Sequence, residues 1–198
     1  MVVTVASYKG GVAKTTTAIH IGDYLNGIAP TLVVDYDPNR SAQAWHQRGR
    51  LQVPVIGEKH LMRHGKNYTH IVADTEVSPK KSEIVDLVTG CDLLIVPTTP
   101  DALSLDALLL TIEAIQSVGA ANYRILLTIV PPAPSHAGDD AREMLKKSNL
   151  PTFKTWIRKY VAFQKAALDG CLVGEVAGDP HAADGAADYL AVGREILK

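Results

Sequence analysis

The sequence has few of the features that mark secreted, membrane-spanning or strongly basic proteins. Its two cysteines, Cys91 and Cys171, cannot make a disulfide framework or a four-thiolate zinc site, so a reducing, cytoplasmic compartment is expected. No uninterrupted apolar run reaches the roughly 18 residues of a membrane span, and the first residues lack the basic region of a signal peptide. The chain has 20 Lys and Arg residues and 21 Asp and Glu residues. Its formal net charge is therefore −1, which excludes a globally basic nucleic-acid binder.

The 198 residues fit one globular domain, spanning 1–198. Short apolar runs predict strands over residues 2–6, 31–34, 69–73, 93–96 and 125–130, and helices are expected over 14–26, 103–118, 139–147 and 183–197. Residues 53–67 give no readable pattern, and 131–138 are expected to form a mobile loop. Continuous apolar strands that alternate with helices are typical of a doubly wound α/β fold, with a mainly parallel sheet and helices on both faces. Ligands bind such sheets at the carboxyl ends of the strands.

The strongest motif is a glycine turn between the first expected strand and the first expected helix. It reads Lys9-Gly10-Gly11-Val12-Ala13-Lys14-Thr15-Thr16. In such a turn successive backbone N–H groups point at an anion, and the following helix adds its N-terminal dipole. Lys14 would then reach the β- and γ-phosphates of a nucleotide, and the Thr15 hydroxyl would complete a magnesium shell. The alternative is an ordinary glycine turn before a helix. It is disfavoured because a strand, the glycines, the Lys-Thr pair and a helix all follow one another in the order that a phosphate-binding loop requires.

The motif departs from the general P-loop pattern, since Tyr8 and Ala13 stand where that pattern has glycines. What remains, K-G-G-x-x-K-T-T, resembles the deviant Walker A box of the ParA/MinD family of ATPases. The resemblance implies a P-loop NTPase fold, bound ATP and Mg²⁺, and slow ATP hydrolysis. It also implies that the additional lysine, Lys9, crosses a dimer interface to the partner's nucleotide. An alanine can stand at position 13 if its backbone dihedrals are helical, but it could weaken or slow nucleotide handling.

Two further motifs supply carboxylates at strand ends. Asp35 and Asp37 in the sequence Val-Val-Asp-Tyr-Asp-Pro-Asn are well placed for magnesium and water, although these residues also favour a plain turn. The segment resembles the family's D-x-D-P-Q box, with Asn39 in place of glutamine. That resemblance implies that Asp37 orients or activates the attacking water and that Asp35 supports the magnesium shell.

Asp74 follows another apolar run, which is the minimal Walker B pattern. The aspartate of that pattern holds magnesium through water, so Asp74 is a candidate magnesium contact. The alternative for Asp74 is a helix cap. By the family resemblance, the loop after the strand over 125–130 lines the adenine, which places Pro131 among the nucleotide contacts.

The segment from Arg142 to Lys165 is strongly basic, although the chain as a whole is not. The segment contains seven basic residues and one acidic residue, Glu143, so its net charge is +6 and that of the rest of the chain is −7. Clustered cations release counterions from a phosphate backbone and bind DNA without sequence preference. The alternative to DNA binding is that these cations lie on a solvated helix face, with Trp156 and Ile157 packed in the core. The candidate DNA contacts are Lys146, Lys147, Lys154, Arg158, Lys159 and Lys165.

Other candidate sites are weaker. His60 and His64 are spaced i, i+4, but such a pair alone makes a poor metal site, so surface histidines are expected. The segment 183–198 has too few basic and bulky apolar residues to hold a membrane surface.

The ParA/MinD resemblance implies an ATPase that controls the location of a cargo. ATP with Mg²⁺ would drive a nucleotide-sandwich homodimer that binds nucleoid DNA non-specifically, and hydrolysis stimulated by a small adaptor protein would release it. The cargo would be a plasmid or a protein compartment, as in small partition ATPases and carboxysome-positioning relatives such as McdA. The competing hypothesis is a metabolic P-loop ligase or kinase, which would need a small-molecule pocket but no basic dimer face.

Overall fold

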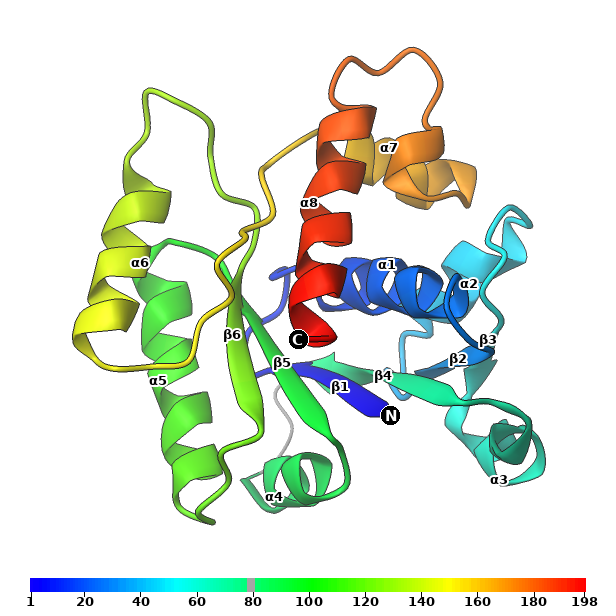
Figure 1. Cartoon of the computed structure of the whole chain (residues 1–198), viewed down its shortest axis with the longest axis horizontal. Coiled ribbons are helices and arrows are strands. Elements are labelled where there is room, and N and C mark those ends of the chain that lie inside the picture. Colours follow the sequence, from blue (N-terminus) through cyan, green and yellow to red (C-terminus); the bar gives the residue numbers. More distant parts are fainter. Residues whose placement is uncertain (78–80) are drawn as a thin grey trace.

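A six-stranded sheet forms the centre of the computed structural model, which describes residues 1–77 and 81–198 (Figure 1). The strands lie in the order β3-β2-β4-β1-β5-β6, and neighbours pair in parallel. Their bounds are β1 Val2–Ser7, β2 Thr31–Asp35, β3 Val55–Gly57, β4 His70–Val77, β5 Leu93–Thr98 and β6 Tyr123–Leu127. The predicted parallel sheet is therefore confirmed.

Helices cover both faces of the sheet (Figure 1). On one face lie α1 (Lys14–Asn26), α2 (Ser41–Gln47), α7 (Ala162–Asp169) and α8 (Ala182–Ile196). On the other lie α3 (Leu61–His64), α4 (Lys81–Thr89) and α5 (Ala102–Gln116), with α6 (Ala137–Lys147) next to α5. The shorter helical turns are η1 (Glu58–His60), η2 (Gly65–Asn67) and η3 (Val173–Glu175). Across the described ranges, no helix combines the length and apolar character that crossing a bilayer requires.

The central strands β1, β2 and β5 are mostly apolar because both of their faces are buried. Side chains alternate along each strand, so Val3, Val5 and Ile95 belong to the core under α1 and α8, whereas Leu94 and Val96 belong to the core under α5. The two cores are the two layers of a doubly wound fold.

The first layer needs a glycine in α1. A Cβ on Gly22 would lie 2.4 Å from Val33 Cγ2, so only glycine lets this helix pack so closely on β2.

The unreadable stretch 53–67 contains the short edge strand β3 and a run of helical turns, η1, α3 and η2. Elements of three or four residues are too short to show a hydrophobic period, which explains why the sequence pattern missed them. The strand expected over 125–130 ends earlier, at Leu127, and α6 begins at Ala137 rather than at 139.

The turn between β1 and α1 places two residues in left-handed backbone conformations. Gly11 has φ +75°, and Ala13 has φ +64° and ψ +33°. Ala13 therefore does not meet the condition of helical dihedrals in the ordinary right-handed sense, because its conformation is left-handed. The turn is held despite the strain, because the Val12 carbonyl accepts a 3.0 Å hydrogen bond from the Thr128 hydroxyl and the Ala13 carbonyl accepts one of 2.9 Å from Thr17 N–H.

His20 joins α1 to α8 and η3 in the first core. Its ring stacks on Tyr189 with the centroids 4.6 Å apart. Nδ1 donates to the Thr16 carbonyl at 2.7 Å, and Nε2 accepts from Val173 N–H at 3.1 Å. These partners leave no acceptor for a second proton, and burial lowers the pKa of His20 to about 4.

We expect Ala13→Gly to raise the free energy of unfolding by about 1 kcal/mol, because glycine adopts the left-handed region without the Cβ clash. Urea unfolding monitored by circular dichroism measures the change. Ala187→Gly, at an exposed position in the right-handed helix α8, is the matched control and should lose about 1 kcal/mol. If Ala13→Gly loses stability as the control does, the strain assigned to Ala13 is wrong.

The His20 contacts predict lower stability in acid. Unfolded histidine takes up a proton near pH 6.5, whereas His20 in the folded chain does so only near pH 4. Its contribution is therefore complete above pH 6.5 and falls by about 3 kcal/mol between pH 6.5 and 4. The free energy of unfolding in urea is measured for the wild type and for His20→Gln from pH 7.5 to 4.5. The difference between the two proteins isolates the contribution of His20 from that of other titrating groups. A difference that stays constant with pH would contradict the assignment.

Candidate nucleotide-binding site

The parallel register brings three sequence motifs to one end of the sheet. Asp35 at the end of β2 pairs with Asp74 on β4, and Asp74 also pairs with Val5 on β1, just before the glycine turn. All the candidate phosphate and metal contacts from these strands therefore meet beside the N-terminus of α1.

Lys14 is the first residue of α1, and its side chain is held inside the site. The residue is only 6% exposed, and Nζ donates to the Lys9 carbonyl over 3.4 Å. Burial lowers the pKa of Lys14, while the charges of Asp74 and Asp37 oppose that shift. An ammonium group held between the glycine turn and two carboxylates is suited to binding phosphate and metal-linked oxygens.

Asp74 is buried, and neither of its carboxylate oxygens has a hydrogen-bond partner among the described residues. Burial raises the pKa of Asp74 to about 7; nearby Asp35 and Asp37 add to this, whereas the Thr15 hydroxyl and Lys14 act in the opposite direction. A buried carboxylate with free oxygens is costly unless a cation satisfies it. Asp74 and the Thr15 hydroxyl therefore fit a Mg²⁺ ion.

The described residues hold no cluster of three or more Asp, Glu, His or Cys side chains arranged to bind a metal. That agrees with magnesium in nucleotide sites, which takes most of its ligands from phosphates and water.

Asp35 shapes the turn that carries Asp37. Its Oδ1 accepts from Asp37 N–H and its Oδ2 from Gln43 N–H, both at 3.0 Å. Asp37 Oδ1 in turn accepts from Asn39 N–H at 2.8 Å. The plain-turn alternative therefore describes the backbone correctly. The same hydrogen bonds hold Asp37, which is buried, and its charge acts to raise the pKa of Lys14.

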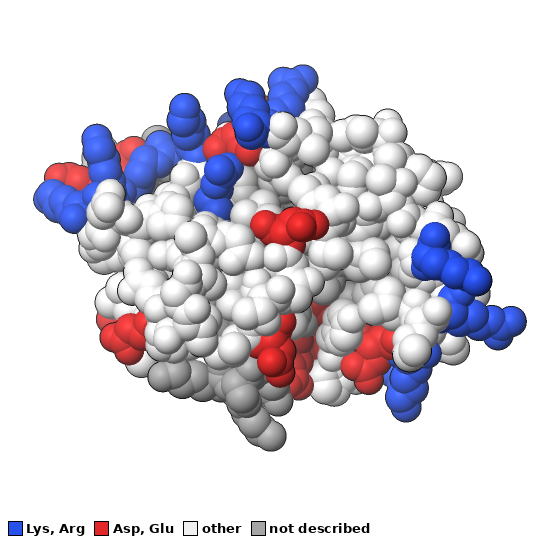
Figure 2. Space-filling view, turned by 60° about the horizontal axis from the view of Figure 1, so that its bottom comes forward, with Lys and Arg blue, Asp and Glu red and all other residues white. Residues whose placement is uncertain are grey.

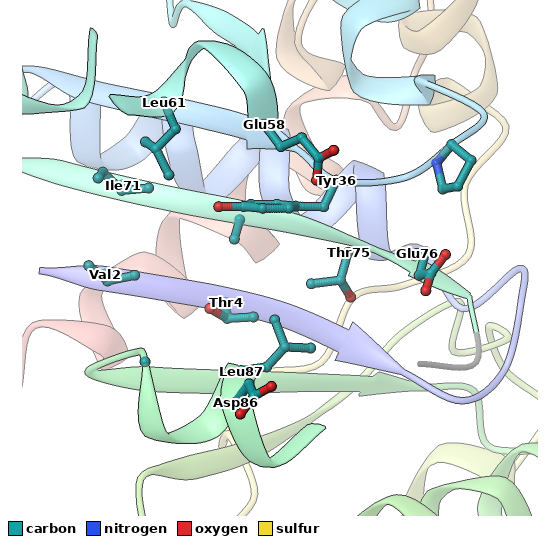
Figure 3. A pocket seen from close by; sticks show the side chains of 13 residues that line it. Val2, Thr4, Tyr36, Glu58, Leu61, Ile71, Thr75, Glu76, Asp86 and Leu87 are labelled. Atoms are coloured by element: carbon teal, nitrogen blue, oxygen red, sulfur yellow. The ribbon is translucent and has the colours of Figure 1, made fainter. Parts of the chain in front are cut away.

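Tyr36, between these two aspartates, points away from them. It lines a cavity of about 700 Å³ whose floor is formed by β1 and β4 and whose walls include Leu61 and Leu87 (Figure 3). Burial raises the pKa of the Tyr36 phenol, and the charge of Glu58 adds to the shift. The cavity is on the α3 and α4 face of the sheet, opposite α1, so it is separated from Lys14 by the sheet itself.

The side chain of Lys9 is bound within its own chain. Nζ donates to Asp101 Oδ1 at 3.0 Å and to Ser104 Oγ at 2.6 Å. Asp101 also caps α5 by accepting from Ser104 N–H at 3.1 Å. Hydrogen bonds from Ser104 and Thr99, supported by Lys9, hold the pKa of Asp101 well below its usual range.

Asp101 and Ser104 were not predicted as partners of Lys9. The available signal was an aspartate three residues before a serine at the start of an apolar helix, which indicates a cap but no contact 92 residues away in the chain.

Pro131 lies in the loop after β6, close to the turn. Thr128 in the same loop donates to the Val12 carbonyl. Val130 N–H donates to the Ile157 carbonyl at 3.0 Å, and the Val130 carbonyl accepts from Lys159 N–H at 2.8 Å. This pairing ties the predicted adenine loop to the basic segment 142–165.

Tertiary contacts neutralise part of that basic segment. Arg158 makes a fork of hydrogen bonds to Asp188 on α8, with Nη2 2.9 Å from Oδ1 and Nε 3.0 Å from Oδ2. Lys165 pairs with Asp179 at 2.8 Å, and Lys147 pairs with Glu143 at 2.8 Å.

Lys146, Lys154 and Lys159 remain exposed and without an acidic partner in the described chain. Figure 2 shows basic side chains gathered at the upper left of one face and again at its right edge, with acidic side chains between them. The segment's positive face is therefore smaller than its sequence charge of +6 indicates, and Arg158 serves chiefly to hold α8.

The similarity to known proteins extends over nearly the whole chain. The Maintenance of carboxysome distribution protein A of Gloeobacter kilaueensis is 32% identical over 204 aligned positions, covering 98% of this chain and 93% of that protein. A McdA–ATP complex from Cyanothece has a TM-score of 0.77 at 17% identity, covering 99% of this chain and 95% of that one. Septum site-determining protein MinD of Pyrococcus horikoshii, complexed with Mg-ADP, has a TM-score of 0.73 at 16% identity, covering 100% and 96%.

Residues 3–173 match the family described as the CobQ/CobB/MinD/ParA nucleotide binding domain. This range includes the glycine turn, the paired aspartates and Asp74. The resemblance to ParA and MinD proteins is therefore confirmed, and the chain belongs to the CobQ/CobB/MinD/ParA family of nucleotide-binding ATPases.

Proposed function

We propose that this ATPase positions a cargo by cycling between an ATP-bound dimer on DNA and a free monomer. The observation that carries the proposal is the combination of Lys9 with a candidate phosphate and magnesium site, in a chain that aligns along 98% of its length with a carboxysome distribution protein. That alignment favours a protein compartment over a plasmid as the cargo. The proposed cycle is cytoplasmic and nucleoid-associated, needs ATP and Mg²⁺, and includes a small adaptor protein that stimulates hydrolysis.

In this mechanism the chain supplies position and charge. The backbone N–H groups of residues 10–16 and the Lys14 ammonium bind the phosphates. Thr15 and Asp74 would hold Mg²⁺, with Asp35 supporting its water shell, and the ion would neutralise charge between the phosphates. Asp37, held by Asp35 and Asn39, orients the attacking water and accepts its proton.

Dimerisation would require Lys9 to exchange its internal partners for the other subunit's nucleotide. The ion pair with Asp101 is partly exposed, so the exchange costs little Coulomb energy. Apolar side chains that a second copy could cover lie on α5, the helix that Asp101 caps. Leu103 is 74% exposed and Leu110 is 60% exposed. This face supports a nucleotide-dependent dimer centred on Lys9.

We expect Lys9→Ala to lose ATP-induced dimerisation while it still binds nucleotide, whereas Lys14→Ala loses nucleotide binding itself. Light scattering with ATP and Mg²⁺ measures the first property, and a fluorescent ATP analogue measures the second. Lys198→Ala, at an exposed terminal lysine, should behave as the wild type does. Dimers that persist in Lys9→Ala would contradict a role for Lys9 across the interface.

We expect Asp37→Ala, which blocks hydrolysis, to shift DNA of arbitrary sequence in a gel only when ATP and Mg²⁺ are present. Adding Lys146→Gln, Lys154→Gln and Lys159→Gln should reduce the salt dependence of binding, because each lysine that binds a phosphate contributes about 0.9 to the slope of log K against log salt. Absence of any ATP-dependent shift would reject DNA-based positioning and favour a metabolic ligase or kinase.

A further inference from the structure

Residues 58–67 form a run of helical turns on the edge of the sheet, and three cations share its outer side. These residues, Lys59, Arg63 and Lys66, are all exposed, and we call them the α3 stripe. One lies in each of the three consecutive turns η1, α3 and η2, four and three residues apart.

The opposite side of the same turns faces the protein. Leu61 points into the cavity beside Tyr36 and Ile71 (Figure 3). A Cβ on Gly65 would lie 2.9 Å from Leu61 Cδ1, so Gly65 also faces inward. With Leu61 and Gly65 fixed inward, the α3 stripe must face solvent.

No cation of the α3 stripe has an acidic partner within the described ranges, 1–77 and 81–198. The acidic neighbour in the sequence, Glu58, is exposed and lines the cavity beside Tyr36 (Figure 3), and it forms no ion pair with the stripe. The three exposed cations are therefore available to bind an external anion.

The stripe is separate from the nucleotide site and from the basic segment 142–165. It precedes the first residue of β4, whereas Asp74 lies toward the other end of that strand. In Figure 2 basic side chains stand at the right edge, over the region of α3, away from those at the upper left.

The chemistry of the surroundings favours DNA over a lipid surface. Met62, 97% exposed, is the single large apolar side chain that these turns expose, because Leu61 is turned inward. Binding to a bilayer interface needs a wide apolar face, which one methionine does not supply. A row of cations with little apolar surface matches a phosphodiester backbone.

We propose that the α3 stripe is a second contact for the DNA phosphate backbone, additional to Lys146, Lys154 and Lys159. This inference rests on the proposed DNA binding of the ATP-bound dimer. A duplex held at both patches would release more counterions than one held at the basic segment alone, so the salt dependence of binding would be steeper.

The test compares full-length proteins in the Asp37→Ala background with ATP and Mg²⁺. The stripe variant is Lys59→Gln, Arg63→Gln, Lys66→Gln, and the matched control keeps every charge as Lys59→Arg, Lys66→Arg. Fluorescence anisotropy of a labelled duplex over a potassium chloride series gives the slope of log K against log salt. We expect the stripe variant to lose up to about 2.7 from that slope and the control to lose none.

Light scattering with ATP checks that the stripe variant still dimerises; if it does not, Lys66→Gln alone is used, with an expected loss of about 0.9 in slope. An unchanged slope in a protein that dimerises and binds DNA overturns this inference and leaves the proposed function intact. If the Asp37→Ala protein itself binds no DNA, both fail. Binding to phosphatidylserine vesicles that the stripe variant loses, with an unchanged DNA slope, would overturn it in favour of a lipid surface.

Discussion

The buried carboxylate of Asp74 is the constraint around which this end of the molecule is arranged. It lies at the centre of the parallel sheet, paired on one side with β1 and on the other with β2, and its oxygens have no hydrogen-bond donor in the described chain. Such a group costs several kcal/mol if it ionises alone. The neighbouring Lys14 and Thr15 reduce the cost only in part, since the pKa of Asp74 stays near 7. A cation bound beside Asp74 would remove the remaining cost and would stabilise the folded chain by mass action.

The parts of the candidate nucleotide site could be recognised in the sequence because each is local. The glycine turn, Lys14 and the aspartates Asp35 and Asp74 each occupy a few consecutive residues, and the parallel register brings these positions to one end of the sheet. The handedness of Ala13 was not predictable in this way. The carbonyl of the preceding residue, Val12, accepts a hydrogen bond from Thr128, 116 positions further along the chain, and such a long-range contact leaves no local sequence signal.

Which charged side chains remain unpaired was the least predictable property, because it too depends on contacts between residues far apart in the sequence. Counting residues along 142–165 gave +6, but Asp179 and Asp188 fold back onto that segment from later in the chain. The α3 stripe shows the opposite case, in which cations next to an acidic residue stay unpaired. Glu58 is next to Lys59 in the sequence but lines the cavity beside Tyr36. Which charges remain free depends on which side of an element each residue occupies, and short elements such as α3 leave no period from which to read it.

Helix α8 contacts both functional regions through adjacent residues. Tyr189 shares a 3.0 Å hydrogen bond with Thr17 in the first turn of α1, whereas Asp188 holds Arg158 and Glu195 accepts from the N–H groups of Lys154 and Thr155. One helix is therefore hydrogen-bonded both to the first turn of α1 and to the segment that carries Lys154 and Arg158. The geometry of the glycine turn and that of the basic segment are linked through α8, although the two lie far apart in the sequence.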